Sequence, residues 1–105
     1  MYSSLKDIES KELIKGFRVR FIHSENVTLA YWDIDEDAVL PEHSHIHEQI
    51  AIVTDGEFEF TIEGKSTICK PGGIMIIPSN AVHSGRALTN CKITDIFSPV
   101  REDYK

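Results

Sequence analysis

Three of the five histidines in this chain fall within five residues, at His43, His45 and His47, and Gln49 follows two residues later. Successive side chains of an extended strand point to opposite faces, so these four share a face if the segment is a strand throughout. A row of imidazoles facing a core is costly unless each ring is hydrogen-bonded or ligated. Neutral imidazole is also a favoured ligand of divalent transition metals. The spacing therefore predicts a metal site, with a solvent-facing histidine run as the alternative.

A further candidate ligand, His83, lies far along the chain from this cluster. It follows a Pro-Gly-Gly turn, an apolar run and Pro78, which ends that run. On its own, a histidine in such a place is more often a loop or core residue than a ligand. A barrel can bring a distant strand beside the first cluster, so the assignment of His83 depends on the fold.

Short strands dominate the rest of the chain. Runs that alternate apolar and polar residues, or are apolar throughout, predict strands at 17–23, 27–34, 50–53, 57–62, 66–69, 74–77 and 93–97. Asp55-Gly56 is a strong hairpin signal, which predicts that 50–53 pairs with 57–62, and Glu63-Gly64-Lys65 predicts a second turn. The run 74–77 is predicted to be buried. At least seven strands without a long helix predict an all-β antiparallel barrel or sandwich, and the one helix candidate is residues 4–15.

Composition limits what this chain can do. Its 105 residues, 41% hydrophobic and 27% charged, suit one globular domain. A formal net charge of −6 without a Lys/Arg cluster argues against a nucleic-acid partner. No apolar run approaches the ~20 residues that span a bilayer, and the polar N-terminus predicts a cytoplasmic protein. Cys69 and Cys91 are expected to be buried free thiols, because no CxxC motif occurs.

Two motifs resemble those of the cupin superfamily. The first cupin motif is matched by His43-x-His45-x3-Gln49-x6-Gly56, in which Gln49 takes the usual place of a glutamate. The second cupin motif is matched by Gly72-x5-Pro78-x-Asn80-x2-His83, in which Asn80 replaces a glycine. The resemblance implies a small antiparallel double-stranded β-helix, the jelly-roll barrel, with one metal ion inside. It makes residues 1–105 a single cupin domain, with the barrel at 17–100 and an arm or short helix at 1–16.

A narrower resemblance links the chain to the small pectin-degradation cupins. It covers segments 20–28, 31–32, 40–45, 47–50, 56–62 and 95–104. That family is associated with opening 4,5-unsaturated uronate rings released by polysaccharide lyases. The resemblance implies metal ligands at His43, His45, Gln49 and His83. The family pattern skips His47, which is therefore expected to support the pocket rather than to bind the metal.

The same resemblance implies substrate-handling roles for Asp95, Phe97 and Arg101. Asp95 would carry a proton, Phe97 would pack on the sugar ring, and the free planar fork of Arg101 would bind the uronate carboxylate. The alternatives are an aspartate at a strand end paired with an arginine, a core phenylalanine and a surface arginine.

The expected function is metal-dependent conversion of 4,5-unsaturated uronate monosaccharides, from pectin or alginate breakdown, to linear 4-deoxy-5-keto uronates. Three imidazoles and one amide leave a dication its full charge, which favours an anionic sugar substrate. Nickel, manganese, iron, cobalt and zinc all tolerate these ligands. The alternatives are another mononuclear-metal cupin enzyme, such as a dioxygenase or sugar isomerase, and a non-catalytic cupin that binds a sugar acid. The resemblance also implies a homodimer to which the N-terminal arm contributes.

Overall fold

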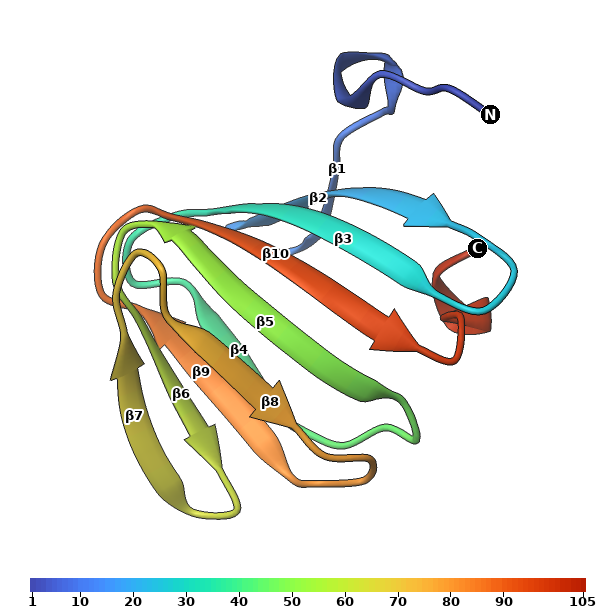
Figure 1. The fold of residues 1–105 in the computed structure, drawn as a ribbon. Coiled ribbons are helices and arrows are strands. Elements are labelled where there is room, and N and C mark those ends of the chain that lie inside the picture. The colour runs from blue at the N-terminus through green and yellow to red at the C-terminus, as the bar shows by residue number, and fades with distance from the viewer.

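Ten strands and two short 3-10 turns make up the computed structural model, which describes residues 1–105 (Figure 1). The elements are η1 (Leu5–Asp7), β1 (Lys11–Ile14), β2 (Phe17–His23), β3 (Thr28–Ile34), β4 (Val39–His43), β5 (Glu48–Asp55), β6 (Phe58–Ile62), β7 (Lys65–Cys69), β8 (Ile74–Ile77), β9 (His83–Ala87), β10 (Cys91–Ser98) and η2 (Glu102–Tyr104). The predicted all-β class with little helix is confirmed. None of the helical turns is long and apolar enough to cross a membrane.

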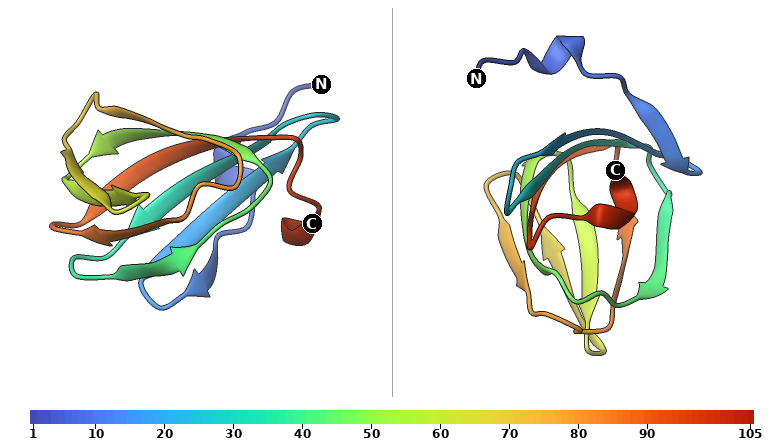
Figure 2. Two further views of the ribbon diagram at one scale, coloured as in Figure 1. Left: turned by 90° about the horizontal axis from the view of Figure 1, so that it is seen from below. Right: turned by 90° about the vertical axis from the view of Figure 1, so that its right-hand side faces the viewer.

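The strands form two antiparallel sheets that close into a jelly-roll barrel. The larger sheet has the order β1-β2-β3-β10-β5-β8 and the smaller one β4-β9-β6-β7. Viewed along the strands, the sheets enclose a common interior, and η2 lies across one end of it (Figure 2). Alternate residues of β5 and β10 are buried, so each of these strands lines the interior with one face. A cluster of twelve buried residues, including Val53, Phe58, Phe60, Ile77 and Ile93, forms the main hydrophobic core.

One predicted hairpin is confirmed and the other is wrong. β6 and β7 pair around Glu63-Gly64, as the sequence indicates. At Asp55-Gly56, however, the chain passes from the larger sheet to the smaller one. There β5 pairs with β8 and β10, whereas β6 pairs with β7 and β9. The turn signal is local, and it cannot distinguish a hairpin from a turn that carries the chain across the barrel.

Two further expectations are corrected at the edges of the larger sheet. The run 74–77 is not buried on both faces, because Ile74 and Ile76 are 62% and 60% exposed on the edge strand β8. Residues 4–15 do not form one helix. They contain the turn η1 and the strand β1, which pairs with β2. Cys69 and Cys91 are buried and free, as expected, and burial raises the pKa of both thiols.

The turn between the two sheets requires a glycine at position 56. Its φ is +76°, and a Cβ built on it would collide with the carbonyl oxygen of Asn90. We therefore expect Gly56→Ala to lower the free energy of unfolding by about 2–4 kcal/mol, from the left-handed φ and the overpacking together. Gly64 is the matched control, since its φ is +78° but nothing lies within 4 Å of the added Cβ. Gly64→Ala should cost only about 1–2 kcal/mol in the same urea titrations. Equal losses at the two positions would contradict this account.

Candidate functional site

Two neighbouring histidines and a third from far along the chain meet at one end of the barrel. His43 on β4 lies opposite His83 on β9 in the strand register, and their ring centroids are 4.1 Å apart. His45 follows β4, and its ring centroid is 4.9 Å from that of His83. One nitrogen from each ring lies within 4.8 Å of the other two, a spacing that a single metal ion could bridge.

Backbone carbonyls orient all three rings. The Nδ1 atoms of His43, His45 and His83 lie 2.8, 3.0 and 2.8 Å from the carbonyl oxygens of Pro41, His47 and Ala81. A carbonyl oxygen only accepts, so each Nδ1 carries the hydrogen and each Nε2 keeps its lone pair. The Nε2 atoms of His45 and His83 are buried without a hydrogen-bond partner. Buried polar atoms without partners are rare in proteins, and a metal ion would satisfy both.

Burial also favours the neutral imidazole. Burial, together with the nearby positive charge of Arg101, lowers the pKa of His45 to about 4. Burial lowers the pKa of His83 as well. A metal ligand must be unprotonated at the binding nitrogen, so the two rings are prepared for this role at neutral pH. The three residues therefore fit a divalent transition metal, and their chemistry does not discriminate among the five candidate metals.

Residues 43–49 are not one strand, so the condition for His43, His45, His47 and Gln49 to share one strand face is not met. β4 ends at His43 in the smaller sheet and β5 begins at Glu48 in the larger one, so residues 44–47 form a bend between the sheets. Gln49 is buried on β5 and lines the same cavity as His43 and His45. His47 is neither in the histidine cluster nor in the cavity wall. Its contribution is the carbonyl that orients His45.

The cluster opens into a cavity of about 300 Å³ within the barrel. Its walls are mainly apolar and aromatic, with a few polar or charged groups supplied by Glu42, His43, His45, Gln49, Asp95 and Arg101. A cavity of this size suits a monosaccharide-sized ligand better than a polymer. Leu13 and Ile14 of β1 also contribute to the wall.

Asp95 is the buried acid of the cavity. It lies within β10 rather than at a strand end, and Trp32 Nε1 donates a hydrogen bond of 2.9 Å to its Oδ2. Its Oδ1 is buried without a partner. Burial raises the pKa of Asp95 to about 7, although the Gln49 and Trp32 side chains oppose the shift. This aspartate is therefore held in place through one oxygen, while the other is available to a ligand.

The guanidinium of Arg101 already has hydrogen-bond partners, so the expected free planar fork is wrong. Its Nε and Nη2 donate to the two carboxylate oxygens of Asp103 at 3.0 and 2.7 Å. Its guanidinium also lies between two rings, 4.7 Å from the centroid of Phe97 and 4.0 Å from that of Tyr104. The side chain is nearly fully buried, so it is not a surface arginine. Only the part of the fork not used by Asp103 can serve a ligand without a rearrangement.

Phe97, Trp32 and Tyr104 are aromatic residues of the wall, to which Phe17, Phe58 and Phe60 also contribute. Phe97 is buried on the same face of β10 as Asp95, as predicted, and its ring meets that of His45 edge-on at 5.7 Å. Trp32 and Tyr104 were not predicted as site residues. The strand register could have identified Trp32 as a site residue. Trp32 lies two residues from Ala30 on the same face of β3, and Ala30 pairs with Asp95. Tyr104 enters only because η2 folds back across the end of the barrel (Figure 2).

Comparison with known proteins identifies the fold family. Residues 30–97 match the model of the cupin domain. The chain is a cupin. This cupin is 33% identical, over 97 residues, to the pectin degradation protein KdgF of Dickeya dadantii (strain 3937), with 90% of this chain and 88% of the relative covered.

Solved structures agree with this assignment. KdgF from a Halomonas species superposes with a TM-score of 0.90 at 27% identity, covering 95% of this cupin and 94% of that chain. An RmlC-like cupin from Shewanella frigidimarina NCIMB 400 superposes with a TM-score of 0.93 at 24% identity, over 99% and 95% of the two chains. The second likeness shows the fold alone. Together these similarities confirm the resemblance to the pectin-degradation cupins.

Proposed function

We propose that this cupin opens the ring of 4,5-unsaturated uronate monosaccharides with the help of one divalent transition metal. The observation that carries the proposal is a cluster of three oriented imidazoles, two of which line one cavity together with a buried carboxyl group and a buried arginine. The similarity to the pectin degradation protein of Dickeya dadantii supports a substrate derived from pectin.

The metal would be held by the Nε2 atoms of His43, His45 and His83, with the Gln49 amide as a fourth ligand. When bound, it would act as a Lewis acid that polarises oxygen atoms of the substrate. All four ligands are uncharged, so the ion would keep its positive charge and attract an anion. With Arg101 nearby, this makes the polar end of the cavity suitable for a uronate carboxylate.

Asp95 is proposed to move the proton. An unsaturated uronate carries a C4=C5 double bond, and C5 also bears the ring oxygen and the carboxylate. The carboxyl group of Asp95 would give its proton to C4 while the oxygen of a water molecule bonds to C5. That water would give one of its two protons to the Asp95 carboxylate, which restores the carboxyl group, and would keep the other as the C5 hydroxyl. The resulting hemiketal opens when the bond from C5 to the ring oxygen breaks. C5 becomes a ketone, and its hydroxyl proton passes to the former ring oxygen, which remains on C1.

The neighbours of Asp95 suit this role. Trp32 holds Oδ2, so Oδ1 has a fixed position from which to reach the ligand. Phe97 and Tyr104 would pack against the sugar ring and exclude water from the end of the cavity. Exclusion of bulk water strengthens the attraction between Arg101 and a carboxylate.

The direct test follows the absorbance of the unsaturated bond. Purified protein loaded with each of the five candidate metals is mixed with 4,5-unsaturated galacturonate or guluronate. We expect the absorbance to fall faster than in the spontaneous reaction, and we expect no acceleration from His43→Ala. If no metal form accelerates the loss of either substrate, the proposal is rejected. Oxygen consumption in the same samples would instead indicate an oxidative cupin.

Arg101 provides a prediction about substrate binding. Arg101→Lys keeps the charge but removes the planar fork that binds Asp103 and, in the proposal, the substrate carboxylate. We expect kcat/KM to fall about 10–100-fold, mainly through a higher KM, which corresponds to the loss of one charge-assisted hydrogen bond. Steady-state kinetics over a range of substrate concentrations measures the effect. An unchanged KM would place the carboxylate elsewhere in the cavity.

A further inference from the structure

The guanidinium of Arg101 is held by one of its two carboxylate-binding edges. A guanidinium presents paired N–H groups along its Nε–Nη2 edge and along its Nη1–Nη2 edge, and each pair matches the two oxygens of a carboxylate. Asp103 takes the Nε–Nη2 edge of Arg101, with bonds of 3.0 and 2.7 Å. Asp103 is the only acidic residue paired with Arg101, so no carboxylate of the chain occupies the Nη1–Nη2 edge.

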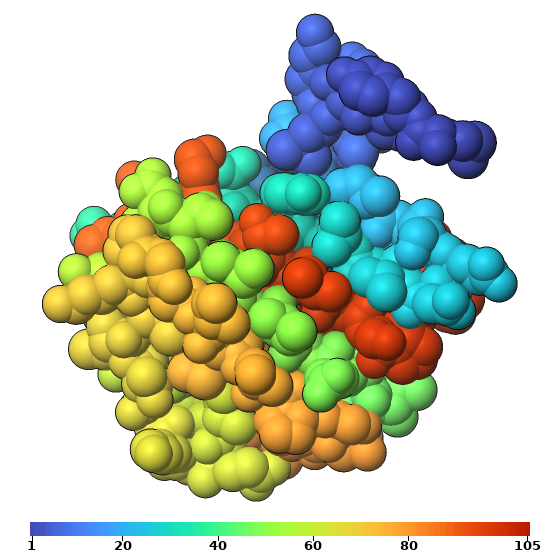
Figure 3. All heavy atoms as spheres, viewed as in Figure 1, coloured from blue at the N-terminus to red at the C-terminus, as the bar shows by residue number.

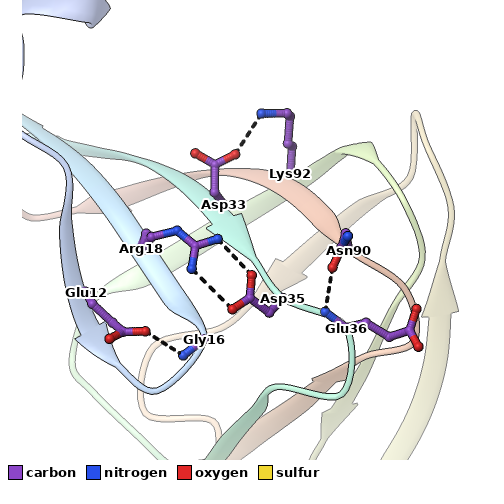
Figure 4. A network of polar contacts seen from close by, with 8 residues as sticks. All are labelled: Glu12, Gly16, Arg18, Asp33, Asp35, Glu36, Asn90 and Lys92. Carbon is purple, nitrogen blue, oxygen red and sulfur yellow. Dashed lines mark hydrogen bonds and ion pairs between the residues drawn. The ribbon is translucent and has the colours of Figure 1, made fainter.

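Another arginine of this chain shows what the second edge can bind. Arg18 donates from Nη1 and Nη2 to the two carboxylate oxygens of Asp35, at 3.2 and 2.8 Å (Figure 4). That pair lies on the surface, where the side chains of Arg18 and Asp35 are 41% and 54% exposed. The side chain of Arg101 is buried and lines the cavity. The edge that Arg18 uses for an acid of its own chain is therefore available, in Arg101, to an acid in the cavity.

The Arg101–Asp103 pair spans the wall of the cavity. Arg101 belongs to the wall, whereas Asp103 does not, and the side chain of Asp103 is 55% exposed. Tyr104 also belongs to the wall, and its ring centroid lies 4.0 Å from Cζ of Arg101. Asp103 therefore holds the guanidinium from the solvent side and takes none of the space in which a ligand would bind.

The backbone that carries this pair is fixed to the barrel. The N–H of Arg101 donates a bond of 2.8 Å to Oγ1 of Thr28, a fully buried residue of β3. The ring of Tyr104 stacks on that of Phe21 from β2, with centroids 4.6 Å apart. In the space-filling view, the red C-terminal end of the chain accordingly packs beside the cyan β2–β3 hairpin, whereas the blue N-terminal residues stand away from the barrel (Figure 3). Arg101 and Asp103 thus keep their places before any ligand binds.

Without Asp103, the guanidinium would have a competing partner. Asp95 lines the same cavity, and Oδ1 of its carboxyl group is buried without a hydrogen-bond partner. If Arg101 turned toward that oxygen, it would block the group that moves the proton in the proposed reaction. It would also use the edge that is otherwise free for the substrate. The bond to Asp103 prevents this by fixing both the position and the plane of the guanidinium.

We propose that Asp103 is a positioning residue, which holds Arg101 by the Nε–Nη2 edge so that the Nη1–Nη2 edge receives the carboxylate of the substrate. The inference rests on the proposed function, since it requires a substrate that carries a carboxylate. An arginine side chain has many rotamers, and a fork that is fixed in advance loses less freedom on binding. The Arg101–Asp103 pair has no net charge, so it selects a carboxylate through its paired N–H groups more than through charge.

This role predicts the opposite of what charge alone predicts. Asp103→Asn removes a negative charge close to the anion site, which on electrostatic grounds would tighten the binding of an anion. Asparagine has nearly the same shape, but its NH2 group cannot accept a bond from Arg101, so one of the two bonds is lost. The fork is then no longer fixed, and we expect weaker binding instead. Glu102→Gln is the matched control, because it removes the same charge from the neighbouring residue, which accepts a bond from Lys105 and not from Arg101.

Isothermal titration calorimetry with saturated galacturonate measures this effect without requiring the ring-opening reaction. The protein is used with added Zn²⁺, the candidate metal that has no redox chemistry, and galactose serves as the sugar without a carboxylate. We expect the wild type to prefer galacturonate to galactose. Asp103→Asn should raise the Kd of galacturonate about 5–30-fold, and Glu102→Gln should leave it within about twofold. The Kd of galactose should be the same in all three proteins.

A Kd of galacturonate that is unchanged or lower in Asp103→Asn would overturn the inference. So would a wild-type protein that binds galacturonate no more tightly than galactose. These outcomes are separate from the fate of the proposed function, which the absorbance assay decides. Absence of ring opening would reject that function, while the Kd values would still decide the role of Asp103.

A double-variant cycle separates positioning from a general loss of structure. If Asp103 acts through Arg101, Arg101→Lys combined with Asp103→Asn should have the galacturonate Kd of Arg101→Lys alone, to within about twofold. In the ring-opening assay, Asp103→Asn should raise KM and change kcat by less than about threefold. Additive losses in the cycle, or a fall in kcat with an unchanged KM, would contradict a positioning role.

Discussion

His83→Ala is expected to abolish activity and to lower metal affinity more than about 100-fold. Loss of a residue that merely supports a ligand already costs about 10–100-fold in affinity, and His83 is proposed as a ligand itself. It is also the only member of the histidine cluster from β9, so its removal takes away one of the three clustered imidazoles. Metal analysis after dialysis and the absorbance assay measure the two effects.

The thermal stability of this variant provides a second readout. A metal that binds only the folded state stabilises it by about 2.7 kcal/mol when its concentration is 100 times Kd. Adding metal to the wild-type protein should therefore raise Tm, and adding it to His83→Ala should not. His23→Ala is the control, because His23 on β2 bonds Thr28 and is not in the cluster. If His83→Ala still gained stability from metal as the wild type does, the metal would lie elsewhere.

Asp95→Asn is expected to lower kcat by about 10²–10⁴-fold, the usual contribution of a positioned acid or base, while metal content is unchanged. Asparagine has nearly the same shape, and its carbonyl oxygen can still accept the hydrogen bond from Trp32 Nε1. It cannot give or take a proton at C4 of the substrate. Single-turnover measurements on the metal-loaded variant separate the chemical step from binding.

Folding stability should respond to Asp95→Asn in the opposite direction. The carboxyl group is buried with one oxygen unpartnered, an arrangement that costs free energy whenever the group is charged. An amide removes that cost, so we expect the free energy of unfolding to stay constant or to rise. Activity lost without stability lost would identify Asp95 as a group retained for chemistry. An active variant would instead assign the proton transfer to another residue, and a strongly destabilised one would make Asp95 structural.

Local sequence patterns were sufficient to predict much of the fold. The alternation in 17–23 predicted β2 with its observed bounds, and the β6–β7 hairpin was predicted from Glu63-Gly64-Lys65. Both features depend on residues that are close in sequence, because side-chain alternation and turn conformation are local properties. The pairing partners of β5 and β6 depend on strands formed later in the chain, and the Asp55-Gly56 hairpin was wrong for that reason.

The candidate site also combines features that the sequence predicts with features that depend on the tertiary structure. Residue type and spacing in the sequence indicated that His43 and His45 are candidate ligands and that Asp95 and Phe97 share a face of one strand, and the cupin resemblance added His83. Only the tertiary structure decided that 43–49 crosses between sheets, that His47 acts through its carbonyl, and that Asp103 already occupies part of the Arg101 fork. Ligand chemistry belongs to each side chain and is visible in the sequence. The direction of a lone pair, and the neighbour that shares a guanidinium, depend on contacts between elements that only the closed barrel brings together.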